Sequence, residues 1–141
     1  MKNKYHNQNL NVLDYDTYFS MTDLLLENKI TEVLNNFNSI LAKGFEGHHF
    51  INGLASHLRD LLVAKDNSTI KLLEVGDNAK KKYLDQSTKA SISFLIKSIE
   101  KANQCDLDYR ASKNQRLLVE LTLMQIASIT FNGEKKNQII T

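Results

Sequence analysis

The segment from Leu117 to Phe131 is apolar around its whole circumference when it is drawn as a helix, and this restricts the possible folds more than any other feature. Ten of its fifteen residues are apolar, and at 100° per residue they surround the helical wheel instead of forming one stripe. A helix of this kind must be covered on most sides. The segment is therefore expected to be the central helix of a bundle, or a helix whose outer face meets another protein.

Apolar residues recur with the helical period of 3.6 in the rest of the chain, and no segment of useful length alternates with the period of a strand. Four further helices are expected to begin at polar caps, which are Asp14 or Asp16, Thr31, Asp77 and Ser91. The prediction is an all-α fold, a single bundle of five to six helices.

Glycines and turn-forming residues mark other expected helix boundaries. Gly44 is the natural stop of the second helix, because glycine tolerates the left-handed conformation found there. A third helix follows Gly47 and is expected to end before Asp66. Gly53 lies inside this helix, where it costs about 1 kcal/mol relative to alanine. Either the surface tolerates it, or another backbone comes close there.

The helix that follows Ser91 is expected to bury one apolar stripe and to end near Cys105 and Asp106. The residues of this stripe are Ile92, Leu95, Ile96, Ile99 and Ala102. Asp106 and Asp108 then lie where a helix cap is expected. Cys105 is expected to be a small core residue and not a nucleophile.

The length of 141 residues fits one domain. Residues 1–11 are expected to be the remnant of a linker, 12–131 a helical domain and 132–141 a flexible tail. A start codon before a ragged polar stretch suggests a fragment of a longer protein. A single cysteine allows no internal disulfide, and no apolar run approaches the ~20 residues of a membrane span. We therefore expect a cytoplasmic domain without a membrane partner.

No catalytic, cofactor-binding or metal-binding residue is predicted, and no small-molecule ligand is expected. The five glycines are scattered and open no phosphate loop. His48, His49 and His57 are close in sequence, but zinc on a helix requires histidines four positions apart. His57 follows the other two by nine and eight positions. Packing and capping histidines are therefore favoured over a metal site.

Nucleic-acid binding is the more serious alternative. Lys80, Lys81 and Lys82 form a basic run, while Arg110, Lys113 and Arg116 recur at roughly helical spacing. Phosphate binding needs several such charges on one face, but the formal net charge is only +2. The lysine run is interpreted as a solvated helix face. A subunit interface is favoured over DNA for the second group, because Glu120 is spaced to form an ion pair with Arg116.

Three stretches carry a resemblance to a known family. They are LNVLDYD at 10–16, HFINGLASHLRDLL at 49–62 and YRASKNQRLLVELTL at 109–123. Together they resemble domain III, the C-terminal oligomerisation region or collar, of the gamma/tau subunit of bacterial DNA polymerase III. The similarity runs from about Leu10 to Ile129. Its most specific part is the third stretch, where Arg116 and Glu120 stand four apart before an apolar run.

The resemblance implies a collar-like fold within the clamp loader, an ATP-driven pentamer that places the sliding clamp on primed DNA. The parent subunit is an AAA+ ATPase, but its nucleotide-binding residues have no counterparts here, so this part is expected to lack enzymatic activity and cofactors. The implied partners are other gamma/tau copies, delta and delta-prime, with DNA reached only through the complex.

The residues predicted to contact neighbouring subunits lie in the last helix and directly before it. These candidates are Arg110, Lys113, Arg116, Glu120, Leu117, Leu121 and Met124. The charged members are expected at the rim or in ion pairs between subunits, around a few buried anchors. The alternative is a free-standing helical DNA-binding or regulatory protein.

Overall fold

The computed structural model describes residues 13–131, and this part of the chain contains six α-helices, one short 3-10 helix and no strand. The elements are α2 (Tyr15–Leu26), α3 (Ile30–Ala42), α4 (Gly47–Val63), η1 (Ile70–Leu72), α5 (Asp77–Ser87), α6 (Ile92–Asp108) and α7 (Gln115–Ala127). The prediction of an all-α bundle of five to six helices is confirmed. No helix of the described part combines the length and the apolar character needed to cross a membrane.

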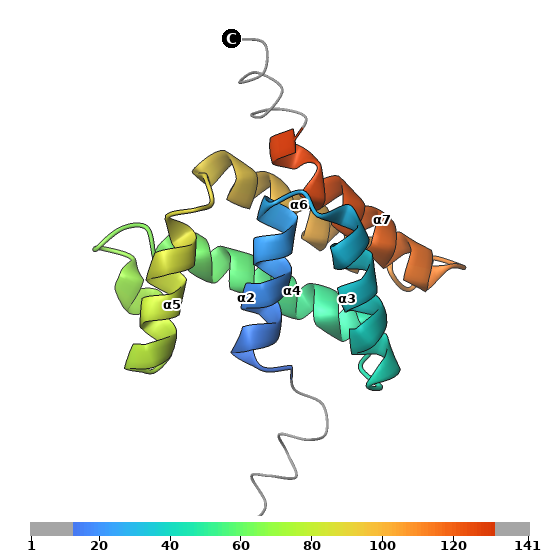
Figure 1. Ribbon diagram of the computed structural model, residues 1–141, viewed down its shortest axis with the longest axis horizontal. Helices are drawn as coiled ribbons and strands as arrows, with labels where there is room; N and C mark the ends of the chain where they lie inside the picture. Colours follow the sequence, from blue (N-terminus) through green and yellow to red (C-terminus); the bar gives the residue numbers. More distant parts are fainter. Residues whose placement is uncertain (1–12, 132–141) are drawn as a thin grey trace, which may run out of the picture.

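Helix α4 is the centre of the bundle and contacts α2, α5, α6 and α7. In Figure 1 it runs across the view behind α2, while α6 and α7 lie above it. Its apolar stripe is fully buried and consists of Phe50, Ile51, Leu54, Leu58 and Leu61. Burial of such a side chain contributes about 1.5–3 kcal/mol. Helix α4 is thus a central helix of the fold, with its apolar stripe covered by its neighbours.

Two of the expected helix caps are formed. The side chain of Asp14 accepts a hydrogen bond from the backbone N–H of Thr17 at 3.0 Å. Ser91 accepts one from the backbone N–H of Phe94, also at 3.0 Å. Asp16, the other candidate for the first cap, lies within the first turn of α2. A cap of this kind is worth about 1 kcal/mol, which helps to fix where α2 and α6 begin.

Two other expected caps are wrong. Thr31 lies inside the first turn of α3, because this helix already begins one residue earlier. The chain turns at Asn28, whose φ of 61° lies in the left-handed region, and this sharp turn lets α3 start early. Asp77 is the first residue of α5, and Gly76 occupies the cap position without a side-chain hydrogen bond.

The glycine positions agree in part with expectation. Gly44 follows α3 with a φ of 97°, and its N–H donates to the carbonyl of Leu41 at 2.9 Å. Helix α4 begins at Gly47 and ends before Asp66, as expected. Gly53 is half-buried, and the group close to it is a side chain, that of Tyr18, and not another backbone.

Helix α6 differs from the prediction in its end and in its buried face. It continues through Cys105 to Asp108, so Asp106 and Asp108 are not caps. Its buried residues are Phe94, Leu95, Ser98, Ala102 and Cys105, whereas Ile92 and Ile96 are exposed. The buried face is rotated by roughly a quarter of a turn from the expected stripe. The reason is that α6 packs against both α4 and α7.

Candidate subunit interface

The helix that was expected to be apolar on all sides is α7, and one of its faces lies in the core. The side chain of Asn114 accepts a hydrogen bond from the backbone N–H of Leu117 at 3.1 Å, so α7 begins at Gln115. Its buried residues are Val119, Thr122, Leu123, Ile126 and Ala127. This face packs against α2, α3, α4 and α6.

The opposite face of α7 is open. Leu117 and Leu121 stand one turn apart and are 51 % and 46 % exposed, and Met124 beside them is half-buried. We call these three residues the α7 stripe. Single exposed apolar residues are normal on a protein surface, but a contiguous apolar patch marks an interaction site. One face of this helix therefore lies in the core, and the expectation that its other face meets another protein stays a prediction.

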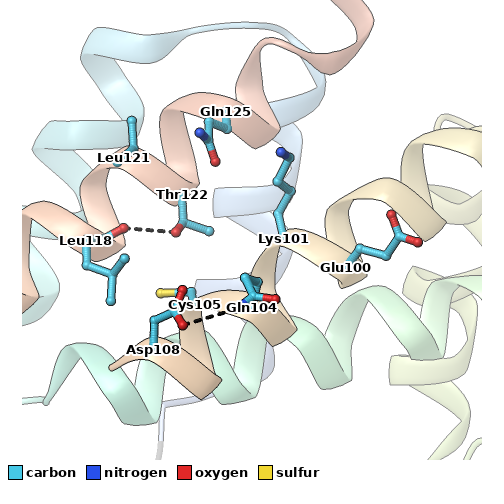
Figure 2. A pocket seen from close by; sticks show the side chains of 9 residues that line it. All are labelled: Glu100, Lys101, Gln104, Cys105, Asp108, Leu118, Leu121, Thr122 and Gln125. Atoms are coloured by element: carbon cyan, nitrogen blue, oxygen red, sulfur yellow. Dashed lines mark hydrogen bonds between the residues drawn. The ribbon is translucent and has the colours of Figure 1, made fainter. Parts of the chain in front are cut away.

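A groove between α6 and α7 continues the α7 stripe on one side. Its cavity volume is about 420 Å³, and Figure 2 shows its lining side chains, which come from these two helices. They are Glu100, Lys101, Gln104, Cys105, Asp108, Leu118, Leu121, Thr122 and Gln125. Cys105 and Thr122 are buried, while Glu100, Lys101 and Asp108 are exposed. The groove therefore has a small buried floor of mixed polarity, with charged side chains around it.

The polar side chains of the groove are partly engaged within it. Thr122 Oγ1 donates to the carbonyl of Leu118 at 2.9 Å, and Gln104 Nε2 donates to Asp108 Oδ1 at 3.1 Å. Burial raises the pKa of the Cys105 thiol, which keeps it protonated and unreactive near neutral pH. The groove therefore offers a surface for packing and not a nucleophile.

Sequence reasoning missed this groove, although a signal for it was present. Thr122 and Gln125 are polar residues three positions apart that interrupt an otherwise apolar run. Residues at this spacing share one side of a helix. They mark the side of α7 that faces the groove.

The predicted ion pair on α7 is present. Arg116 Nε donates to Glu120 Oε2 at 3.0 Å, and Arg116 Nη2 donates to Asn38 Oδ1 of α3 at 2.8 Å. This polar pair lies beside the α7 stripe, on the side of the helix that faces α3. An exposed pair of this kind adds little to stability, so its main effect is to orient the arginine at the rim of the stripe.

Arg110 and Lys113 do not lie on α7, contrary to the helical spacing assumed for them. They belong to the turn between α6 and α7, because the cap formed by Asn114 delays the start of the helix. Both side chains are exposed, and in residues 13–131 neither makes a hydrogen bond or an ion pair. The assignment of the seven candidate residues to an interface stays a prediction. Five of them share α7 and two precede it.

The three histidines are not brought together. His57 is buried, and its Nε2 is 2.8 Å from Gln86 Oε1. Burial lowers the pKa of His57 to about 4, against the opposing effects of the Gln86 hydrogen bond and of the charges of Asp60 and Asp23. This histidine therefore stays neutral and acts as a hydrogen-bonded core residue.

His48 makes a different contact, at the other end of α4. Its Nε2 lies 2.5 Å from Asp106 Oδ1, and its ring stacks on Tyr109 with centroids 4.6 Å apart. This pair joins the start of α4 to the end of α6. His49 borders a separate pocket with Gly44. Within the described residues, no group of three or more His, Cys, Asp and Glu side chains is placed to hold a metal ion.

The basic residues considered for nucleic-acid binding lie in two separate places. Lys80, Lys81 and Lys82 lie on α5, and Lys82 Nζ is paired with Asp16 Oδ1 at 2.8 Å. Helix α5 and the turn between α6 and α7 lie at opposite ends of the molecule in Figure 1. The lysine run and the pair Arg110 and Lys113 therefore do not share one continuous face.

Comparison with known families gave one match. A family model described as DNA polymerase III subunits gamma and tau domain III matches residues 7–139, nearly the whole chain. The matched region contains all three stretches that carry the resemblance found in the sequence. Comparisons with curated proteins and with solved structures gave no match.

Proposed function

Because the chain belongs to the family of domain III of the DNA polymerase III subunits gamma and tau, we propose that it is an oligomerisation domain that holds clamp-loader subunits together. Its partners are other gamma/tau copies and the delta and delta-prime subunits. ATP is bound and hydrolysed by modules outside this chain. The domain itself has no enzymatic activity, needs no cofactor, works in the cytoplasm and reaches DNA only through the assembled complex.

The observation that carries this proposal is the α7 stripe. Leu117 and Leu121 stay about half exposed on a helix whose other face is buried. Covering the exposed part of each leucine contributes about 1 kcal/mol at the usual value per unit of apolar area. The neighbouring groove adds further apolar surface around Leu118. A partner that covers the α7 stripe and the groove would form a contact with a buried apolar centre. Arg116 and Glu120 would lie at the rim of this contact.

A free-standing DNA-binding protein is supported less well. Its affinity would come from many phosphate contacts on one face and would fall steeply with salt. The lysine run at 80–82 and the pair Arg110 and Lys113 lie at opposite ends of the molecule, and Lys82 is paired with Asp16. The formal net charge of +2 adds little general attraction to DNA.

The proposal is tested by mixing the chain with delta and delta-prime and measuring mass by size exclusion with light scattering. The wild-type chain is expected to form a complex, and Leu117→Asp/Leu121→Asp is expected to remain a folded monomer. Leu84→Asp on α5 is the matched control, because Leu84 is also exposed but lies away from α7. This control variant should assemble like the wild type.

Two results would contradict the proposal. One is a wild-type chain that stays strictly monomeric and binds neither subunit. The other is a double variant that assembles as well as the wild type. Titration with duplex DNA at low salt, run on the same preparation, tests the alternative, which requires binding that weakens as salt is added.

A further inference from the structure

Helix α5 is held to the bundle by few large apolar side chains. It lies at one edge of the molecule beside α2 and α4 (Figure 1). Its buried residues are Tyr83, Gln86 and Ser87. Leu73 before the helix and Ala90 after it are buried as well and anchor its two ends. Segments with few buried apolar contacts open more easily than the core of a protein. The segment 74–89 between these anchors therefore depends mainly on its polar contacts.

The polar contacts of α5 converge on the side chain of Gln86. Its Nε2 donates to the backbone carbonyl of Phe19 at 2.9 Å and to Asp23 Oδ1 at 2.8 Å. Both of these partners are acceptors, so the amide nitrogen faces them and Oε1 faces His57 Nε2, 2.8 Å away. One residue of α5 is thus bound to both α2 and α4. The ion pair between Lys82 and Asp16 is exposed and adds little.

This network determines which nitrogen of His57 carries the proton. Because Gln86 Oε1 can only accept, His57 Nε2 is the donor, and Nδ1 remains as an acceptor. Nδ1 is buried and has no hydrogen-bond partner within residues 13–131. A second proton would bind at Nδ1, where the ring would become charged without water or an acceptor. A buried charge of this kind is costly, so the charged ring requires contact with water.

Side chains of α2, α4 and α5 surround the His57 ring. The rings of Phe19 and Tyr83 lie with their centroids 4.7 and 5.2 Å from it, and the ring of Tyr18 lies at 6.1 Å. The charged groups that act on it are the carboxylates of Asp23 on α2 and Asp60 on α4. Both favour the charged ring, but burial outweighs them and lowers the pKa of His57.

The two helices that cover His57 are not equally secured. Met21 and Leu25 fix α2 in the core, where both are fully buried. Helix α2 also packs against α3 and α7. Helix α5 has no fully buried aliphatic side chain of its own. Water therefore reaches the His57 ring at the lowest cost when α5 moves away and α2 stays in place.

We infer that segment 74–89 opens as a unit while the rest of the bundle stays folded, and that protonation of His57 releases it. Opening breaks the hydrogen bonds of Gln86 and exposes the His57 ring. The closed form holds this ring neutral, whereas the open form takes up a proton. Acidification below about pH 6.5 therefore shifts the equilibrium toward the open form. This inference goes beyond the proposed function and does not depend on it, because it involves α5 and not the α7 stripe.

Amide hydrogen exchange of the full chain measures this opening, expressed as protection factors so that the chemical pH dependence of exchange is removed. At pH 7 the amides of α5 should be less protected than those of α4. Their protection should also depend less on denaturant, because opening exposes less surface than global unfolding. From pH 7 to pH 5 the protection of α5 should fall roughly 20-fold. This ratio follows from a pKa of 6.5 for His57 in the open form and of about 4 in the closed form.

His57→Gln should remove most of this fall in protection, and His49→Gln on the same helix is the control that should keep it. Three results overturn the inference. They are α5 amides that depend on denaturant as strongly as those of α4, α5 protection that is equal at pH 7 and pH 5, and a fall as large in His57→Gln as in the wild type. The first two need only the wild type, so they decide the matter even where His57→Gln does not fold.

Discussion

The ring of Tyr18 fills the space beside Gly53 that a larger residue would need. A Cβ placed on Gly53 would overlap the hydroxyl group and the nearest ring carbons of Tyr18. The ring cannot easily move away, because it is buried and stacks on Phe50 with centroids 5.8 Å apart and planes inclined by 10°. The close contact between α2 and α4 therefore depends on a glycine within α4.

Gly53→Ala is expected to lower the free energy of unfolding by about 1–3 kcal/mol, the usual cost of overpacking a core. Alanine would otherwise stabilise a helix by about 1 kcal/mol relative to glycine, so the sign of the change is informative. Chemical denaturation followed by circular dichroism gives the measurement. Asn52→Ala, at the neighbouring exposed position, is the control and should be neutral or stabilising. In a Tyr18→Val background the cost of Gly53→Ala should disappear, and a cost that persists would contradict the overlap.

Stability is expected to fall on acidification because of His57. Burial lowers the pKa of this residue from the ordinary value of 6.5 to about 4, so between these two pH values the unfolded chain binds a proton that the folded protein does not. The free energy of unfolding should therefore decrease as the pH falls from about 6.5 to about 4 and lose this dependence below that. The total effect is roughly 3 kcal/mol.

His57→Gln should remove this part of the pH dependence, and it keeps a polar group near Gln86. Denaturation midpoints measured from pH 7 to pH 4 compare it with the wild type. The matched control is His49→Gln, for a histidine that is exposed near the start of α4. It should retain the wild-type slope. If the denaturation midpoint changes with pH equally in the wild type and in His57→Gln, groups other than His57 control the loss of stability in acid.

Asn28 is expected to hold the C-terminal end of α7. Its Nδ2 donates to the carbonyl of Ala127 at 2.7 Å and lies 2.9 Å from Thr130 Oγ1. Asn28→Gly keeps the left-handed φ of 61° and loses these hydrogen bonds, at an expected cost of about 1–2 kcal/mol. Asn28→Ala adds backbone strain of about 1 kcal/mol. In thermal unfolding, the melting temperature should be highest for the wild type, lower for the glycine variant and lowest for the alanine variant. The reverse order of the two variants would exclude the strain.

Two leucines on opposite faces of α7 should respond differently to aspartate. Leu121 is 46 % exposed and Leu123 is fully buried. Leu121→Asp should leave the helical circular dichroism intact and change stability by about 1 kcal/mol or less, whereas Leu123→Asp buries an unpaired charge and should unfold the domain. An unfolded Leu121→Asp variant would mean that the α7 stripe is covered by the chain's own core.

The class of fold was predictable because helical periodicity is a local property of the sequence. The caps at Asp14 and Ser91 could be predicted for the same reason, since each bonds a backbone N–H only three residues away. Thr31 failed as a cap because the left-handed turn at Asn28 is supported by hydrogen bonds to residues about a hundred positions away. Local patterns carry no information about such contacts.

The candidate interface was predictable only in outline. The apolar circumference of α7 indicated either a central helix or a helix whose outer face meets another protein. Choosing between these two requires knowledge of which elements pack around α7. Arg110 and Lys113 were misplaced because their spacing fits a helix that the cap at Asn114 does not allow. The exposure of Ile92 and Ile96 on α6 was missed because their spacing fits a buried stripe as well as an exposed one. Only the packing of α6 against two neighbours decides between them.

Helix α7 is fastened to the N-terminal half of the bundle near both of its ends, by Arg116 to Asn38 and by Ala127 to Asn28. A helix held near both ends resists tilting away from the bundle more than a helix held at one end. If a partner binds at Leu121, as proposed, its pull on α7 is expected to reach α2 and α3 without bending of α7.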